Sequence, residues 1–291
     1  MIGTAGCRGA ATIVNAIATG KGAAFGISLE TDVSVDLSDG KGRIALAEQA
    51  EGGSLVEGCV RSAIKKSKLG YECHGTVTIR SEIPISRGLK SSSAVSNAVV
   101  LGTVRAIGSD KDLSDRDIIL TGIEESIKAG VTITGAFDDA CACYYGGAVM
   151  TNNRTFQILR QYPMDEDLEV LIHVPERRIE KSTVKGLDFS RISKEVEKAF
   201  ELAMKGQFLK AMEVNSRAYS KVLDVSEDVA ELARKNGALA AGISGTGPAT
   251  VVLCERGEAG HLASVLRKQE GKVLVARMNH TPAREVEPRL L

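Results

Sequence analysis

The sequence contains no tryptophan, and aromatic residues make up only 4% of its 291 residues. Proteins that bind single-stranded nucleic acid or stack sugars rely on aromatic side chains as platforms. The 37 basic and 37 acidic residues cancel, so there is no excess of positive charge to attract a nucleic acid or an anionic membrane. These absences favour small metabolites as binding partners.

Metal-ligand spacing and targeting segments are also absent. The six cysteines form no C-x-x-C pair and the four histidines are scattered, whereas zinc ligands usually occur in closely spaced pairs. No window approaches 18 uninterrupted apolar residues, and the first residues do not combine a basic segment with an apolar run as signal peptides do. We therefore expect a cytoplasmic protein with buried, reduced thiols.

Two widespread nucleotide-binding patterns are missing. Every Gly-Lys in the chain lacks the earlier glycine that a Walker A motif requires, and no G-x-G-x-x-G follows a strand-like segment. P-loop kinases and Rossmann dehydrogenases are therefore disfavoured.

What the sequence does contain is a stretch that turns an extended segment into a helix. It reads Pro84-Ile85-Ser86-Arg87-Gly88-Leu89-Lys90-Ser91-Ser92-Ser93-Ala94. Gly88 allows a sharp bend, and the three serines then occupy the cap and first turn of a helix that we expect to continue to Ile107. The first amides of a helix lack intrahelical partners and lie at the positive end of its dipole, so this turn is suited to bind a phosphate.

Hydrophobic periodicity predicts a mixed α and β chain. Extended segments are expected up to Leu46 and again around 75–83, 146–150, 168–174, 249–254 and 272–278. Helices are expected at 54–68, 115–128, 193–205, 207–223, 226–236 and 258–269. The sequence further predicts a linker around 152–163, a polar, basic loop at 177–183 and a polar tail from Thr281 to Leu291.

Two acidic pairs stand out along the chain. Glu124 and Glu125 lie near the end of the helix predicted at 115–128, where the dipole disfavours anions, so a metal partner is worth considering. Asp138 and Asp139 lie in a setting rich in glycine, threonine and alanine, where two carboxylates are costly unless they are paired or used. Together with the phosphate loop, these acids predict an enzyme that transfers phosphoryl groups; a regulatory nucleotide-binding module without catalysis is the alternative class.

Three segments in order resemble the motifs of the GHMP kinases. The stretch from Pro84 to Ala94 matches their phosphate-binding motif, and Ser244-Gly245-Thr246-Gly247-Pro248 matches their glycine-rich loop closely. The third match is loose: Gly6 to Ala16, followed by Thr19 to Gly22, aligns with their N-terminal motif, with Arg8 at the family's lysine and Asn15 at its histidine.

The resemblance implies a two-domain α+β architecture: an N-terminal, ATP-binding domain of ribosomal-protein-S5-like type at 1–160 and a ferredoxin-like C-terminal domain at 161–291. It also implies a set of roles. Asp139, seven residues before Gly146, is the expected base, with Asp138 as the alternative, and Arg8 is the expected cation near the phosphates. The motif residues 84–93 and Gly245, Thr246 and Gly247 bind ATP, and Ser92 with Glu125, or Glu124, holds Mg²⁺.

Four stretches resemble the archaeal shikimate kinases within that superfamily. They are 15–22, 88–98, 134–140 and 244–248. This branch implies ATP-dependent phosphorylation of the 3-hydroxyl of shikimate, a step towards chorismate and the aromatic amino acids. Homoserine kinase is the alternative, although that enzyme characteristically carries asparagine at the position of Asp139. Arg177, Arg178 and Lys181 are candidates, on position alone, to bind the shikimate carboxylate.

Overall fold

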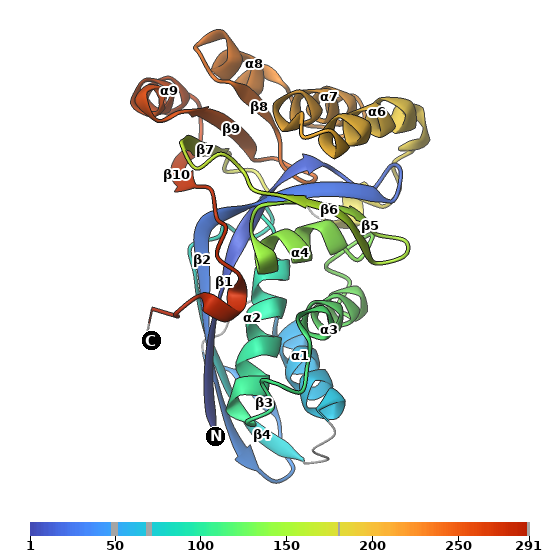
Figure 1. Cartoon of the computed structure of the whole chain (residues 1–291), viewed down its shortest axis with the longest axis vertical. Coiled ribbons are helices and arrows are strands. Elements are labelled where there is room, and N and C mark those ends of the chain that lie inside the picture. The colour runs from blue at the N-terminus through green and yellow to red at the C-terminus, as the bar shows by residue number, and fades with distance from the viewer. Residues whose placement is uncertain (48–51, 68–71, 180, 290–291) are drawn as a thin grey trace.

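The computed structural model describes residues 1–47, 52–67, 72–179 and 181–289, which form two lobes stacked along the long axis of the molecule (Figure 1). The lower lobe contains a six-stranded sheet and the upper lobe a four-stranded sheet. In the described part of the chain, no helix is long and apolar enough to cross a membrane.

A very long strand organises the lower sheet. The sheet has the order β3-β4-β2-β5-β6, with β1 paired to β2. The first residues of β2 pair with β5 and its later residues with β4, so this one strand links both ends of the sheet. The strands are β1 (Ile2–Val14), β2 (Lys21–Asp39), β3 (Ile44–Leu46), β4 (Cys73–Ser81), β5 (Ala148–Asn152) and β6 (Gln157–Tyr162).

Three helices pack against this sheet, a fourth, α3, packs on those three, and α2 is central. They are α1 (Gly53–Lys66), α2 (Ser91–Ala106), α3 (Asp115–Lys128) and α4 (Phe137–Tyr145). From Ala94 to Val104 nearly every residue of α2 is buried, because β1, β2 and the other three helices surround it. A capping box starts α3: the Ser114 hydroxyl accepts a hydrogen bond from the Asp117 amide, and the Asp117 side chain accepts one from the Ser114 amide.

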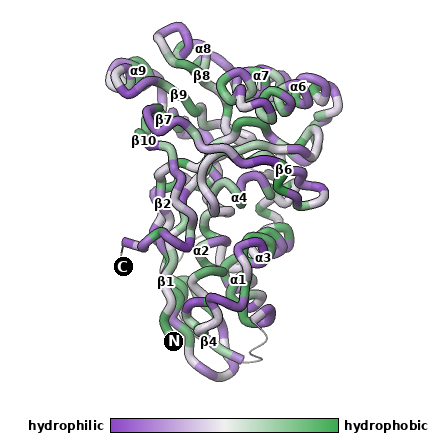
Figure 2. Tube along the Cα trace, in the orientation of Figure 1, coloured by the Kyte–Doolittle hydropathy of each residue, from purple (hydrophilic) through white to green (hydrophobic). Residues whose placement is uncertain are grey.

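The upper sheet is antiparallel, in the order β10-β7-β9-β8. Its strands are β7 (Leu168–Val174), β8 (Ala240–Ile243), β9 (Thr250–Glu255) and β10 (Lys272–Arg277), and the helices of this half are α5 (Lys181–Val184), α6 (Ser193–Met204), α7 (Phe208–Ser220), α8 (Asp228–Lys235) and α9 (Ala259–Leu266). Helices α6 and α7 pack on β1 between the lobes, whereas α8 and α9 lie at the far end and expose hydrophilic residues, purple in Figure 2.

Most predicted elements are present, with shifts of a few residues at their ends, and the extended state expected up to Leu46 includes the 13-residue strand β1. Three elements were missed. The helix α4 starts at the second acidic pair, and the short helix α5 begins within the polar, basic loop expected at 177–183. The expected linker around 152–163 contains β6, which ends at Tyr162. The division into domains 1–160 and 161–291 stays a prediction.

The expected polar tail is wrong. After β10 the chain returns to the lower lobe, where the Asn279 amide donates to the Gly26 carbonyl and the Gly147 amide donates to the Asn279 carbonyl. Ala283 and Val286 are buried there. We call residues 278–289 the C-terminal strap. One of its polar residues is paired with the lower lobe: the Arg284 guanidinium contacts Asp110 and Asp115 at 2.7 and 2.5 Å, and donates to the Leu113 carbonyl at 2.7 Å.

We expect Arg284→Met to lower the free energy of unfolding by about 2 kcal/mol, because hydrogen bonds to a charged group are lost and two carboxylates lose their cation. Urea denaturation followed by circular dichroism measures this change. Arg267→Met is the matched control at an exposed position, with an expected change within about 0.5 kcal/mol. Equal effects of the two substitutions would show that the strap does not stabilise the lower lobe.

Candidate active site

The phosphate loop has the geometry that its sequence predicts. It connects β4 to α2, with Gly88 at φ +84° and Lys90 at φ +65° as the residue that caps the helix. Ser91, Ser92 and Ser93 form the first turn of α2, and all three line a large cavity. Unpaired amides, the helix dipole and small hydroxyl side chains therefore face the same space, which suits a polyphosphate.

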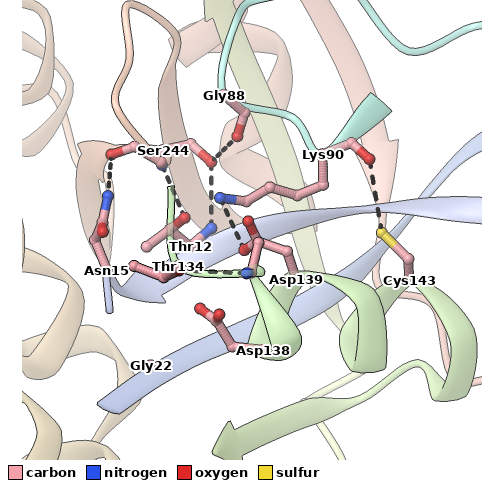
Figure 3. Close-up of polar contacts among 12 residues, drawn as sticks. Thr12, Asn15, Gly22, Gly88, Lys90, Thr134, Asp138, Asp139, Cys143 and Ser244 are labelled. Atoms are coloured by element: carbon pink, nitrogen blue, oxygen red, sulfur yellow. Dashed lines mark hydrogen bonds and ion pairs between the residues drawn. The ribbon is translucent and has the colours of Figure 1, made fainter. Parts of the chain in front are cut away.

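The glycine-rich loop from the upper lobe holds the phosphate loop in place (Figure 3). The Ser244 hydroxyl donates to the Gly88 carbonyl at 2.8 Å, and the Gly245 amide donates to the Thr12 hydroxyl at 2.8 Å. Asn15, just after β1, donates from its side chain to the Gly245 carbonyl at 2.8 Å. The three motifs, far apart in the sequence, thus meet at one point.

The large cavity has a volume of about 1040 Å³, at the upper end of the range for small-molecule sites. One part of its wall is apolar and comes from β3, α1 and β4; it includes Leu46, Leu55, Val56, Val77 and Ile79. The phosphate loop forms the middle, and Val174, Pro175, Arg178 and Lys272 close it from the upper lobe. An apolar end beside an amide-rich loop fits a nucleotide with its base at one end and its phosphates at the other.

A second, much smaller cavity of about 40 Å³ adjoins the first. The two share Lys90, Thr132, Ala136, Asp139 and Thr246 in their linings. Thr12, Asn15, Ala16, Ile17, Ile133, Thr134, Asp138 and Gly245 line only the small one. The two cavities therefore adjoin at the residues that they share.

An ion pair lies where the two cavities meet. The Lys90 ammonium is 2.9 Å from Asp139 Oδ1, and the two side chains are only 6% and 17% exposed. Asp139 lies in the first turn of α4, where the helix dipole also favours a negative charge. Figure 3 shows Lys90 reaching across from the phosphate loop to the start of α4. A carboxylate and an ammonium are therefore positioned between the compartments, as a transfer of a phosphoryl group from one to the other requires.

Asp138 occupies a different environment. Its side chain is 4% exposed, and Asn153 Nδ2 donates to its Oδ1 at 2.7 Å. Burial raises the pKa of Asp138 to about 7, and the neighbouring charge of Asp139 acts in the same direction. Near neutral pH this carboxyl is therefore protonated in a substantial fraction of molecules.

Arg8, the expected phosphate cation, is not in either cavity. On β1 its Nη1 donates to Asn279 Oδ1 at 2.6 Å, and its Nε lies 3.4 Å from Glu30 Oε2. It lines a separate surface depression with Glu30 and Arg289. A register shift in β1 between Arg8 and Ala10 decides which way this side chain points, and that shift cannot be read from the motif. Lys90, which the sequence places among the ATP-binding residues of the phosphate loop, is a cation that does line both cavities.

The structure separates the two glutamates that the sequence left open as metal ligands. Glu125 is buried against α1: its Oε1 accepts hydrogen bonds from Ser62 at 2.7 Å and Lys128 at 2.5 Å, and these bonds lower its pKa despite burial. Glu124 is more exposed and pairs with Lys66 at 2.9 Å. Ser92 lines the large cavity whereas Glu125 does not. Among the described residues, no cluster of three or more His, Cys, Asp or Glu is arranged to hold a metal ion.

The arginines considered for a carboxylate lie away from the small cavity. Arg177 is half exposed and pairs with Asp224 at 3.0 Å, while Arg178 lines the large cavity. The side chain of Lys181 lies outside the described part of the structure. Arg87 donates to the carbonyls of Pro175 and Glu176, which joins the phosphate loop to the upper lobe.

Sequence reasoning missed several residues that shape the small cavity. Thr12 and Asn153 act through hydrogen bonds to segments distant in sequence. Lys90 gave one signal that could have been used, since it is a cation inside a phosphate-binding motif next to two aspartates that needed a partner.

A helix whose first turn is three serines, a glycine-rich loop and a buried Lys-Asp pair between two cavities fit an ATP-dependent small-molecule kinase. Family models agree: that for the GHMP kinases N terminal domain matches residues 54–147, and that for the GHMP kinases C terminal domain matches 194–272. The chain belongs to the GHMP kinase family.

Curated relatives specify the branch. The chain is 39% identical over 280 residues to the shikimate kinase of Methanosarcina acetivorans, covering 94% of this chain and 93% of the relative. It is 40% identical over 251 residues to the shikimate kinase of Pyrococcus furiosus, covering 86% of this chain and 90% of the relative.

Solved structures share the fold. A homoserine kinase from Cytophaga hutchinsonii superposes with a TM-score of 0.78 at 18% identity, covering 96% of both chains. The Methanococcus jannaschii mevalonate kinase superposes with a TM-score of 0.74 at 17% identity, covering 96% of this chain and 98% of that one. At such identities the likeness concerns the fold alone.

We expect Gly88→Ala to weaken ATP binding by about 10-fold or more. A Cβ at Gly88 would lie 2.0 Å from the Ser244 carbonyl oxygen, and the positive φ is itself unfavourable for alanine, so the loop must move. Isothermal titration with a non-hydrolysable ATP analogue measures the change. Gly186→Ala is the matched control, because nothing lies within 4 Å of its Cβ position. Unchanged affinity in the folded Gly88 variant would contradict the role of the loop.

Proposed function

We propose that this chain is a shikimate kinase, which transfers the γ-phosphoryl group of ATP to the 3-hydroxyl of shikimate, a step towards chorismate and the aromatic amino acids. Curated shikimate kinases at 34–40% identity over most of the chain support this proposal. The observation that carries it structurally is the Lys90–Asp139 pair, which lies where the nucleotide-sized cavity meets the small one. A cytoplasmic location, predicted from the sequence, is part of the same proposal.

The geometry suggests how the residues act. The large cavity holds ATP with its phosphates against the first turn of α2, and the acceptor enters the small cavity. Asp139 accepts the proton as the acceptor oxygen bonds to the γ-phosphorus and the bond from phosphorus to the bridging oxygen of ADP breaks. Lys90 compensates negative charge on the phosphoryl oxygens and on Asp139. The low exposure of both side chains strengthens these interactions.

Mg²⁺ is the second part of this proposal. The Ser92 hydroxyl and the Glu125 carboxylate are hard oxygen donors of the kind that Mg²⁺ prefers, and Ser92 faces the phosphate space. Glu125 fits less directly, because one of its oxygens accepts from Ser62 and Lys128. Lys128 is exposed and can leave without breaking the fold. When bound, the ion neutralises phosphate charge.

A coupled assay for ADP release tests the function. We expect turnover with shikimate, and none above background with homoserine or mevalonate at the same concentration. Phosphorus NMR of the product identifies the 3-phosphate. Preferential turnover of homoserine would overturn the proposal.

Asp139→Asn should reduce kcat by roughly 10²- to 10⁴-fold, because the group that accepts the proton is lost while the shape of the side chain is kept. The KM for ATP should change little, since other residues hold the phosphates. Lys90→Met should also reduce kcat strongly. Arg8→Met is the matched control, because it removes a cation that lies outside both cavities. The kcat of this variant should stay within about 3-fold of the wild-type value, since Arg8 has no role in the transfer. A loss with Arg8→Met comparable to that with Lys90→Met would restore Arg8 as the catalytic cation.

Ser92→Ala should raise the Mg²⁺ concentration needed for half-maximal activity by about 10-fold or more, since even the loss of an outer-shell partner of a metal commonly costs 10- to 100-fold. The measurement is a Mg²⁺ titration at fixed ATP, with thermal unfolding to show that the fold is retained. Ser91→Ala, in the same turn, is the control. If both variants require the same Mg²⁺ concentration as the wild type, Ser92 is not a ligand.

A further inference from the structure

Two carboxyl groups line the small cavity, and the mechanism uses only one of them. Asp139 lines both cavities and pairs with Lys90, so it lies beside the phosphates. Asp138 lines the small cavity but not the large one. Because successive helical residues point about 100° apart, the two carboxyls reach different points in that cavity. Asp138 is therefore placed to contact a part of the acceptor that does not react.

The orientation of Asp138 is fixed by Asn153. The Thr151 hydroxyl donates to Asn153 Oδ1 at 2.6 Å, and the Asp138 amide donates to the same oxygen at 3.3 Å. With its oxygen occupied by two donors, Asn153 must present its Nδ2 to Asp138 Oδ1, at 2.7 Å. This bond forms whether or not the carboxyl is protonated, and it leaves Oδ2 as the oxygen that Asn153 does not hold.

Gly22 on β2 leaves the space that Oδ2 occupies. A Cβ at Gly22 would lie 2.4 Å from Asp138 Oδ2 and 3.0 Å from the Cβ of Ala16, which lines the small cavity. The carboxyl therefore lies directly over the glycine, beside the cavity wall (Figure 3). A side chain at position 22 would displace the Asp138 carboxyl, so Gly22 is what allows the acid to occupy this position.

We propose that Asp138 is a specificity-determining residue that binds a second hydroxyl of the acceptor, on the ring carbon next to the one that is phosphorylated. The inference rests on the proposed function, under which that group is the 4-hydroxyl of shikimate. A hydroxyl both donates and accepts, so it pairs with either protonation state of the carboxyl. Asp138 and Asp139 are neighbours in the first turn of α4 and both line this cavity, so we expect them to contact neighbouring groups of the acceptor.

Burial gives this contact its selective power. A buried acid that loses its hydrogen-bonding partner is costly, so an acceptor without the second hydroxyl leaves Asp138 unsatisfied. An acceptor with a single hydroxyl on a flexible chain meets the same penalty. The pair of aspartates then selects a vicinal diol, with Asp139 acting on one oxygen and Asp138 on the other.

The test compares kcat/KM for shikimate, 4-deoxyshikimate and 5-deoxyshikimate. In the wild type we expect loss of the 4-hydroxyl to reduce kcat/KM by about 100-fold. In Asp138→Ala, kcat/KM for shikimate should fall by a similar factor while kcat/KM for 4-deoxyshikimate is nearly unchanged. The variant should therefore no longer discriminate between the two acceptors. Discrimination against 5-deoxyshikimate and the KM for ATP should be the same in both proteins.

Gly22→Ala provides a second route that keeps the acid and displaces it. Like Asp138→Ala, it should reduce the ratio of kcat/KM for shikimate to kcat/KM for 4-deoxyshikimate. It tests the proposal even if Asp138→Ala folds poorly. Gly260→Ala is the matched control, since nothing lies within 4 Å of its Cβ position and it is far from the site in α9. It should retain wild-type discrimination.

Two outcomes would overturn the inference, and they are distinguishable. If the wild type phosphorylates shikimate but Asp138→Ala and Gly22→Ala slow all three acceptors equally, Asp138 has a structural role and the proposed function stands. If the wild type phosphorylates homoserine rather than shikimate, the proposed function fails, and the inference fails with it because that acceptor has no second hydroxyl.

Discussion

The close approach of two backbones, at Gly88 and Ser244, is the constraint on which the site depends. The space for a Cβ at Gly88 is already occupied by the Ser244 carbonyl, and the Ser244 hydroxyl returns a hydrogen bond to the Gly88 carbonyl. Since one residue belongs to the phosphate loop and the other to the upper lobe, this contact fixes the lobes relative to each other. The cavities exist as shaped compartments because that relation is fixed.

Electrostatics then differentiates two neighbouring acids. Asp139 has an ammonium 2.9 Å away and lies between the cavities, whereas Asp138 has a neutral amide as its partner and is more deeply buried. Burial, together with the neighbouring charge of Asp139, raises the pKa of Asp138, whereas the lysine pairs with Asp139. Identical side chains thus acquire different chemistry from their surroundings.

Local signals in the sequence were sufficient for part of this site. The phosphate loop combines a glycine, a serine-rich helix start and an alternating strand, all within about 20 residues, and those residues predict its turn from strand to helix. They did not predict that Lys90, at φ +65°, and not a serine would cap the helix. The position of Asp139 came from its spacing to Gly146. Arg8 was misplaced because the face to which a strand residue points depends on pairing register, and β1 shifts register beside it.

The remaining features depend on contacts between distant segments. Lys90 finds its partner 49 positions along the chain, and Asn153 reaches Asp138 through the pairing of β5 with β2. Arg284 of the C-terminal strap pairs with Asp110 and Asp115, which are distant in the sequence. No local pattern connects these residues, and the strap was therefore predicted to be a polar tail. Composition indicates that such residues are polar, but it does not say whether water or another charge satisfies them.

The strap also bears on how the molecule is made. The N-terminal part of a chain leaves the ribosome first, and domains commonly fold from the N-terminus towards the C-terminus during synthesis. Here the lower lobe, whose sheet and helices precede the upper lobe in the sequence, receives a packing layer and the ion pairs of Arg284 from residues synthesised after the upper lobe. The lower lobe is therefore completed only after the upper lobe has been synthesised, and contacts of such large sequence separation slow folding.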